Sequence, residues 1–288
     1  MPSPREQTTP TQSRSLNMRF LCLHGYATNA EVLEQQILPL RNHLPSNWEF
    51  EFLEANHAPS SIFTPSLEGD WDSLYAWYNL PLKDDVENAL EDILDFIDSE
   101  GPFDGILGFS QGGLMAATLL LWDASRPEGP QLPFKMAVFI STFAPHNVTT
   151  DTVMWDLDGE ELVATVKGQS HETDWKVDPR TSFDFHVLQR NLDKVTFPVH
   201  LLPKHNPKDD HARINIPTVF VRGQQEPNDV GFDQFLGLIS SPALRTLRHS
   251  GAHHFPKPAW EVAQMAELMV KTSLEFASGP AGLSLAKI

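Results

Sequence analysis

The feature that most constrains this chain is a short apolar run that ends in a Gly-x-Ser-x-Gly motif. Phe103–Phe109 is typical of a buried strand, Gly108–Gly112 of a very tight turn, and the apolar residues from Leu114 onward of a buried helix. Such a turn lifts one serine hydroxyl out of the top of a sheet, and its glycines leave room for the strained backbone. The pattern therefore predicts that Ser110 is a nucleophile.

The chain before this motif has the pattern of a parallel α/β sheet. Met18–Leu23 is predicted as a buried strand and Trp48–Leu53 as a second one. Between them, Thr28 and Glu31 have the spacing of a capping box that begins a helix. A strand, a glycine turn, a helix and another strand are the opening of an α/β fold. The apolar stripe of the predicted helix consists of Leu33, Ile37, Leu40 and Leu44.

The alternation of helices and strands continues after the motif. A helix with Asp84, Asp85 and Glu87 in its first turn precedes the motif, and the helix that follows it is apolar nearly all round. We predict an α/β fold with a mostly parallel sheet and helices on both faces. The later predicted elements are strands at Lys135–Thr142, Pro217–Gly223 and Leu244–Arg248, and helices near Val230–Leu238 and Pro258–Phe276.

An insertion of about 70 residues interrupts this alternation. Residues 148–213 are rich in charge, His and aromatic side chains, and only a short helix around Asp184–Leu192 is predicted there. Free loops of this length are rare inside a compact domain, so we interpret the insertion as a cap or lid. The predicted organisation is a disordered leader over residues 1–17, a hydrolase-like α/β domain over 18–277 with its lid at 148–213, and a loose tail over 278–288.

A second irregular stretch, Ala58–Leu82, is rich in aromatic residues but has no regular period. Two interpretations stay open: the rings line a pocket for an acyl or aryl group, or they pack at the edge of the sheet. The aromatic residues are Phe63, Trp71, Tyr75, Trp77 and Tyr78.

Charge and cysteine content narrow the class of protein. The formal net charge of −17 argues against nucleic-acid binding, which needs clustered Lys and Arg, and indicates a solvated acidic surface. No apolar run reaches the length of about 18 residues that a membrane span needs, and the first 17 residues are polar. The single cysteine, Cys22, lies in an apolar run and is interpreted as core packing. These features predict a soluble, cytoplasmic protein without membrane attachment.

Motif order supports the nucleophile. In an α/β-hydrolase sheet the chain order is oxyanion loop, nucleophile, acid and histidine. His24-Gly25 follows the first predicted strand, so the backbone N–H of Tyr26 is placed as one oxyanion donor, with the N–H of Gln111 as the other.

The acid is expected in the turn after the strand that ends at Gly223. Two carboxylates lie there, Glu226 and Asp229, and either one is able to orient an imidazole. The spacing from the end of the strand favours Glu226, and Asp229 stays the alternative.

The base is expected in the loop before the closing helix, where His249, His253 and His254 compete. Three histidines within six residues also suggest a metal, but no acids or cysteines are grouped near them to complete a zinc site. We therefore expect no metal and no other cofactor. His200, His205 and His211 in the insertion are predicted to be surface residues.

Four motifs together resemble the fungal serine hydrolase (FSH) family. They are Leu21–Asn29, Gly108–Gly113, Ile140–Pro145 and His249–Pro256, and the likeness covers most of residues 18–276. The family pattern at the last motif, HxGGHxxP, has its second His as the catalytic one, which implies His253. The pattern in the acid turn is GxxD, whereas this chain has Glu226 at that place, and the insertion is longer than in the simplest members.

The resemblance implies an α/β-hydrolase without a metal that acts as a carboxylesterase or thioesterase. Many members of the family act beside fungal polyketide synthases. The resemblance therefore implies an acyl thioester or ester as substrate and an acyl-carrier domain of a polyketide synthase as partner. Two other functions remain open: a general carboxylesterase of small esters, and a binding protein of the same fold without turnover. The triad predicted from residues and resemblance together is Ser110, His253 and Glu226.

Overall fold

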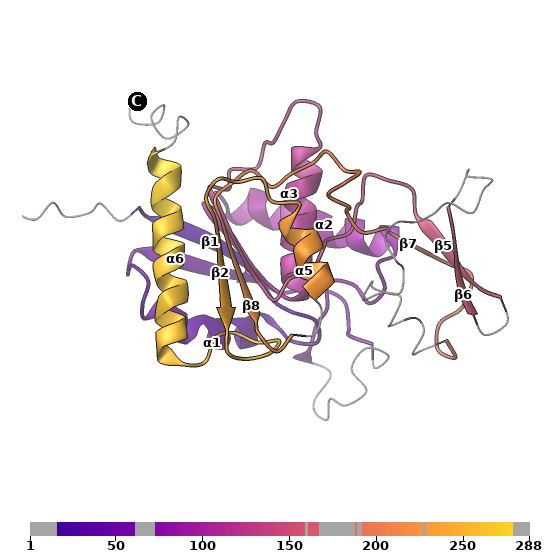
Figure 1. Ribbon diagram of the computed structural model, residues 1–288, viewed down its shortest axis with the longest axis horizontal. Coiled ribbons are helices and arrows are strands. Elements are labelled where there is room, and N and C mark those ends of the chain that lie inside the picture. Colours follow the sequence, from indigo (N-terminus) through magenta and orange to yellow (C-terminus); the bar gives the residue numbers. More distant parts are fainter. Residues whose placement is uncertain are drawn as a thin grey trace, which may run out of the picture.

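The computed structural model describes residues 16–60, 73–158, 161–166, 188, 192–226 and 229–278. A six-stranded sheet, in which every neighbouring pair is parallel, forms its centre in the order β2-β1-β3-β4-β8-β9 (Figure 1). The predicted α/β class is confirmed. The sheet elements and helices are β1 (Met18–Leu23), α1 (Ala30–Arg41), β2 (Trp48–Leu53), α2 (Lys83–Glu100), β3 (Gly105–Phe109), α3 (Gln111–Ala124), β4 (Met136–Ile140), β8 (Thr218–Gly223), α5 (Asp229–Leu236), β9 (Leu244–His249) and α6 (Ala259–Ser278).

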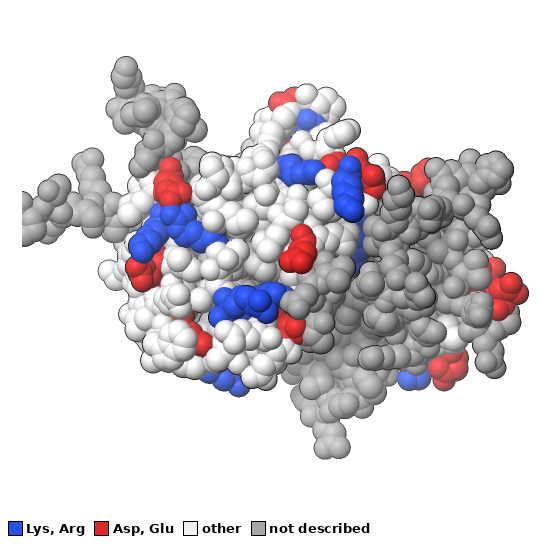
Figure 2. All heavy atoms as spheres, viewed as in Figure 1, with Lys and Arg blue, Asp and Glu red and all other residues white. Residues whose placement is uncertain are grey.

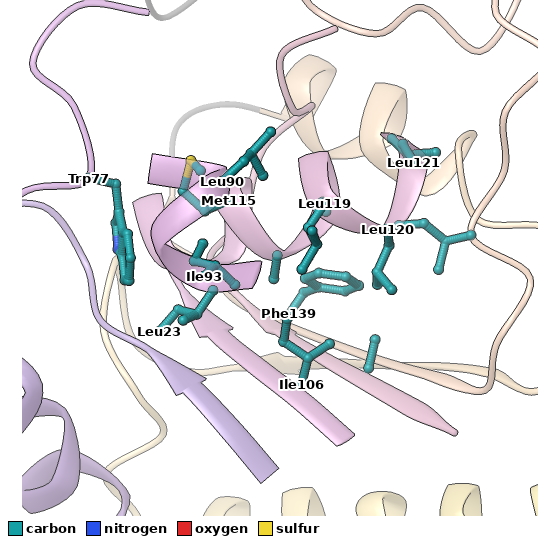
Figure 3. Close-up of a cluster of buried hydrophobic side chains, with 14 of the residues drawn as sticks. Leu23, Trp77, Leu90, Ile93, Ile106, Met115, Leu119, Leu120, Leu121 and Phe139 are labelled. Carbon is teal, nitrogen blue, oxygen red and sulfur yellow. The ribbon is translucent and has the colours of Figure 1, made fainter. Parts of the chain in front are cut away.

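Helices cover both faces of the sheet, and each face has its own apolar core. Helices α1 and α6 pack on one face, and α2, α3 and α5 on the other (Figure 1). Helix α3 is buried nearly all round, as its sequence predicts, because it contacts β1, β3 and β4 of the sheet as well as α2. Cys22 is fully buried in β1, and burial raises the pKa of its thiol, which confirms its interpretation as core packing. Figure 3 shows Leu23, Ile106 and Phe139 of the sheet beneath Ile93, Met115 and Leu119 of the helices.

The start of α1 differs from the predicted capping box. The cap is Asn29, whose side-chain oxygen accepts a hydrogen bond from the Val32 N–H at 2.7 Å. Thr28 lies outside the helix because its main chain pairs with Tyr75, in a short antiparallel bridge. The prediction that Thr28 and Glu31 begin the helix is therefore wrong by one residue, because the side chain of Asn29 rather than that of Thr28 caps the helix.

The insertion contains a second, three-stranded antiparallel sheet that the sequence analysis missed. Its order is β6-β5-β7, formed by β5 (Val153–Asp158), β6 (Glu161–Val166) and β7 (Val199–Leu201), and it lies beside the main body (Figure 1). Val153 and Trp155 are buried in β5, whereas Asp156 and Asp158 are not. This alternation was a strand signal, but the surrounding charge concealed it. The buried cluster of this sheet consists of Val153, Trp155, Leu188, Val199 and Leu201, packed against Leu80, Leu82, Val195 and Phe197.

Several predicted segments fall outside the described residues. They are residues 1–15 of the leader, 279–288 of the tail, Phe63 and Trp71 of the aromatic stretch, and most of the helix predicted around Asp184–Leu192. The domain boundaries and the lid thus stay predictions.

His205 corrects the prediction that the histidines of the insertion lie at the surface. His200 and His211 are exposed, but His205 is buried and its Nδ1 lies 2.8 Å from Asp210 Oδ2. The same carboxylate accepts hydrogen bonds from the Asn206 N–H and from Asn147. A histidine in a polar segment is buried here because a carboxylate supplies the partner that water would otherwise supply.

The Asp210 cluster predicts an acid-dependent part of the protein's stability. Partial burial alone would raise the pKa of Asp210, but the hydrogen bonds from His205 and Asn206 lower it below its usual 3.8. A depressed folded-state pKa stabilises the fold above the unfolded value and ceases to do so as pH falls through the folded value. We expect Asp210→Asn to lower Tm at pH 6 by about 2–4 °C, a difference that shrinks by pH 3.

Thermal unfolding of both proteins at pH 6 and pH 3 measures this difference. The exposed neighbour Asp209 provides the matched control, because Asp209→Asn removes a carboxylate without breaking the His205 contact. A Tm difference for Asp210→Asn that is the same at both pH values would contradict the assignment.

The surface visible in Figure 2 carries charges of both signs close together. Lys and Arg lie beside Asp and Glu on this face rather than in one field of a single sign. An ion pair of this protein's surface is formed by Arg245 and Glu275. Within the described residues, no helix is both long and apolar enough to span a bilayer.

Candidate active site

Ser110 lies in the strained turn between β3 and α3, at the carboxyl edge of the sheet. Its backbone adopts φ 52°, a conformation that non-glycine residues rarely take. Gly112 allows the turn, because a Cβ there would lie 2.1 Å from the Leu23 carbonyl oxygen and 2.4 Å from that of His24. The nucleophile turn thus packs directly against the end of β1, and only glycine at position 112 fits this approach.

His253 comes from the loop between β9 and α6 and meets Ser110. Its Nε2 lies 2.8 Å from the Ser110 Oγ, a hydrogen-bonding distance. The other two histidines of the loop hold its backbone: His249 Nδ1 accepts from the Gly251 N–H, and His254 Nε2 accepts from the Ala252 N–H. Burial lowers the pKa of His249, so this imidazole is uncharged at neutral pH. Of the three competing histidines, the structure brings His253 to the serine.

Glu226 lies on the other side of the His253 ring. Its Oε1 is 2.9 Å from the His253 Nδ1, and its Oε2 accepts a hydrogen bond from the Gly223 N–H at 3.3 Å. The carboxylate is buried, which strengthens its interaction with a nearby imidazole. Asp229 begins α5, and its side chain lies outside the described part of the chain. The structure therefore brings Glu226 into contact with the histidine.

Two phenylalanine rings bracket the His253 imidazole, whose side chain is 42% exposed. Phe143 stacks almost parallel to it, with ring centroids 6.0 Å apart, and Phe109 lies at 5.4 Å on a tilted plane. Phe143 stacks in turn on Phe232 at 4.8 Å. These contacts restrict the rotation of an otherwise accessible side chain. Sequence reasoning gave neither phenylalanine a role, because a Phe at the end of a strand or just after it is also ordinary core packing.

The two predicted oxyanion donors follow neighbouring strands. Leu23 of β1 is in register with Gly108 of β3, so the segments that contain Tyr26 and Gln111 leave the sheet side by side. A Cβ on Gly25 would lie 3.4 Å from the Ser110 Cβ, which shows how closely the loop after β1 approaches the serine. The loops are therefore adjacent, as the predicted donor pair requires.

His24, in the same loop, is a buried structural residue. Burial lowers its pKa to about 4. Its Nδ1 donates to the Gly25 carbonyl at 2.8 Å, and its Nε2 accepts from the Ala55 N–H at 3.1 Å. The HisGly motif thus fixes the loop through both ring nitrogens.

A parallel α/β sheet with a Gly-x-Ser-x-Gly turn at its carboxyl edge defines a serine hydrolase of the α/β-hydrolase fold. The chain belongs to the serine hydrolase (FSH1) family, whose model matches residues 14–265. The predicted family is thereby confirmed, and with it the class of enzyme.

Individual relatives carry related names. The chain is 42% identical over 263 residues to "Hydrolase FUB4" of Fusarium oxysporum f. sp. lycopersici, covering 88% of this chain and 98% of the relative. It is 30% identical over 268 residues to "Esterase alnB" of Emericella nidulans, covering 85% and 92%. Among solved structures, the carboxylesterase of Bacillus cereus is similar at 13% identity, over 89% of each chain, with a TM-score of 0.49.

Proposed function

We propose that this protein cleaves an acyl thioester or ester through a triad of Ser110, His253 and Glu226. The observation that supports it is the continuous pair of contacts through one imidazole: 2.8 Å from Ser110 Oγ to Nε2, and 2.9 Å from Nδ1 to Glu226 Oε1. A serine hydroxyl is unreactive until a base takes its proton, and a buried carboxylate stabilises the imidazolium that results.

The proposed reaction has two stages. His253 takes the proton of Ser110 while Oγ attacks the acyl carbonyl carbon, and the main-chain N–H groups of Tyr26 and Gln111 donate to the developing oxyanion. The tetrahedral intermediate then collapses, breaking the bond from carbon to sulfur or oxygen, and His253 gives its proton to the leaving group. Water attacks the acyl-enzyme in the same way and releases the carboxylic acid and free Ser110.

The proposed substrate is an intermediate or product of polyketide type in fungal secondary metabolism, presented as a free thioester or on an acyl-carrier domain. The support is the family membership and the resemblance of the sequence motifs to polyketide-pathway members. The insertion with its β5–β7 sheet is proposed as a lid over this substrate, and the cytoplasm as the compartment. General hydrolysis of small esters is the competing activity.

Turnover of matched substrates tests the substrate class. With one acyl group offered as an N-acetylcysteamine thioester and as the corresponding oxygen ester, we expect kcat/KM to be at least about tenfold higher for the thioester, a difference of about 1.4 kcal/mol in barrier. The rate measured with the Ser110→Ala enzyme, which represents background hydrolysis, is subtracted from each wild-type rate. An equal or higher kcat/KM for the oxygen ester would instead identify a general carboxylesterase.

A further inference from the structure

A short segment within the irregular stretch Ala58–Leu82 contacts both segments that supply the predicted oxyanion donors. This segment, Trp77–Asn79, is called the strap below. Its neighbours Tyr75 and Ala76 pair as short antiparallel bridges with Thr28 and His57. The strap is therefore fixed at the carboxyl edge of the sheet, beside the ends of β1 and β2.

The strap holds Gln111 through two buried hydrogen bonds. The side-chain oxygen of Gln111 accepts from the Trp77 main-chain N–H at 3.0 Å, and its amide nitrogen donates to the Tyr78 carbonyl at 2.7 Å. The backbone N–H of Gln111 is the predicted donor beside Ser110. The side chain of this residue is thus held at both its oxygen and its nitrogen.

The strap also holds the loop after β1. The indole N–H of Trp77 donates to the His24 carbonyl at 2.8 Å, and the two rings lie 5.4 Å apart. That carbonyl oxygen is one of the two atoms against which Gly112 packs. Trp77 is 1% exposed and stands at the end of β1, next to Leu23 (Figure 3).

Asn79 completes the contacts by holding Tyr26, the second predicted donor residue. The Tyr26 hydroxyl donates to the Asn79 side-chain oxygen at 2.7 Å, and the same oxygen accepts from the Ser60 N–H at 2.8 Å. Burial raises the pKa of Tyr26 to about 12, so its hydroxyl keeps the proton that it donates.

We propose that the strap is a positioning element for the oxyanion hole, with Trp77 and Asn79 as positioning residues. The inference rests on the proposed function, because it concerns the same site. Oxyanion stabilisation depends on donors that are fixed before the reaction, and a displacement of about 1 Å is costly in rate. The two donor segments already touch through Gly112 and Gly25, and the strap adds hydrogen bonds from a third segment to both of them. The strap thereby restrains both donor segments beyond what the sheet register and the glycine contacts do.

Substitution of Trp77 by Phe tests the strap, because it removes the indole N–H and keeps an aromatic ring in the core. We expect kcat to fall about 10- to 100-fold with KM within about threefold, since the oxyanion is present only in the transition state. Affinity for a boronic acid, which forms a tetrahedral adduct on serine, should fall by a similar factor. Trp48→Phe is the matched control: Trp48 is also buried and donates to one main-chain carbonyl, that of Leu16, at the opposite edge of the sheet.

All rates are expressed per site labelled by a fluorophosphonate, so that loss of folded protein does not imitate loss of kcat. A wild-type kcat per site in Trp77→Phe, or an equal loss in Trp48→Phe, would overturn the proposal. Where Trp77→Phe does not fold, the half-buried Asn79 decides: Asn79→Ala should lower kcat about tenfold at constant KM, and an unchanged kcat overturns the strap. Failure of the proposed function has a different signature, namely a wild-type protein that neither labels nor depends on Ser110.

Discussion

Ser110→Ala is expected to lower kcat for a p-nitrophenyl ester by about 10⁴- to 10⁶-fold while leaving the fold intact. Without Oγ no acyl-enzyme forms, and only water attack assisted by the remaining groups is left. The hydroxyl contacts the exposed His253 ring and fills no core space. We therefore expect a Tm within about 2 °C of the wild-type value. Steady-state turnover together with thermal unfolding measures both quantities.

Ser141 offers a control with the same backbone conformation. It directly follows β4 as Ser110 directly follows β3, and it also adopts φ 52°. Its Oγ is buried and makes no hydrogen bond within the described residues. Ser141→Ala should keep kcat within about threefold of the wild-type value, because it removes a hydroxyl beside the site without touching the proposed triad.

Retained turnover of short p-nitrophenyl esters by Ser110→Ala would contradict the proposal that Ser110 is the nucleophile.

Glu226→Gln is expected to lower kcat about 10³- to 10⁴-fold. The amide keeps the size of the side chain but loses the negative charge that stabilises the imidazolium. It also offers His253 Nδ1 an NH₂ group, which favours the wrong tautomer or rotates the ring away from Ser110. The comparison with wild type uses kcat/KM across pH 6–9, so that a shifted pH optimum is not read as a loss of rate.

Asp229→Asn is the matched control for Glu226→Gln, since it removes a carboxylate three residues further along the same turn. We expect it to change kcat/KM by less than about threefold. The reverse ranking, with Asp229→Asn the more damaging variant, would transfer the acid role to Asp229.

The sequence predicted the architecture well because the order of motifs is a consequence of the sheet. Ser110, Glu226 and His253 each follow a strand of one parallel sheet, and the carboxyl ends of such strands meet at one edge. The need for glycine is a further constraint. Helix α3 begins against the end of β1, and only a glycine at position 112 leaves room for this approach. Family likeness then selected one histidine from three.

What sequence reasoning left open or missed depends on contacts between distant segments. Glu226 and Asp229 lie so close together in the sequence that their spacing from the strand does not decide which of them contacts the histidine. The contacts of Trp77 with His24 and Gln111 join residues 53 and 34 positions apart and leave no local pattern. The prediction that His205 lies at the surface is wrong because its contact with Asp210 leaves no pattern in the sequence. The sheet of the insertion was missed because charged residues surround its strands and because β7 pairs with β5 across a long intervening segment.

The most direct test of the proposed triad is peptide mapping by mass spectrometry after reaction with a fluorophosphonate. We predict one adduct per chain, on the peptide that contains Ser110, and labelling at least about 100-fold slower in His253→Ala. An unlabelled wild-type protein, an adduct on another serine, or labelling that does not depend on His253 would contradict it.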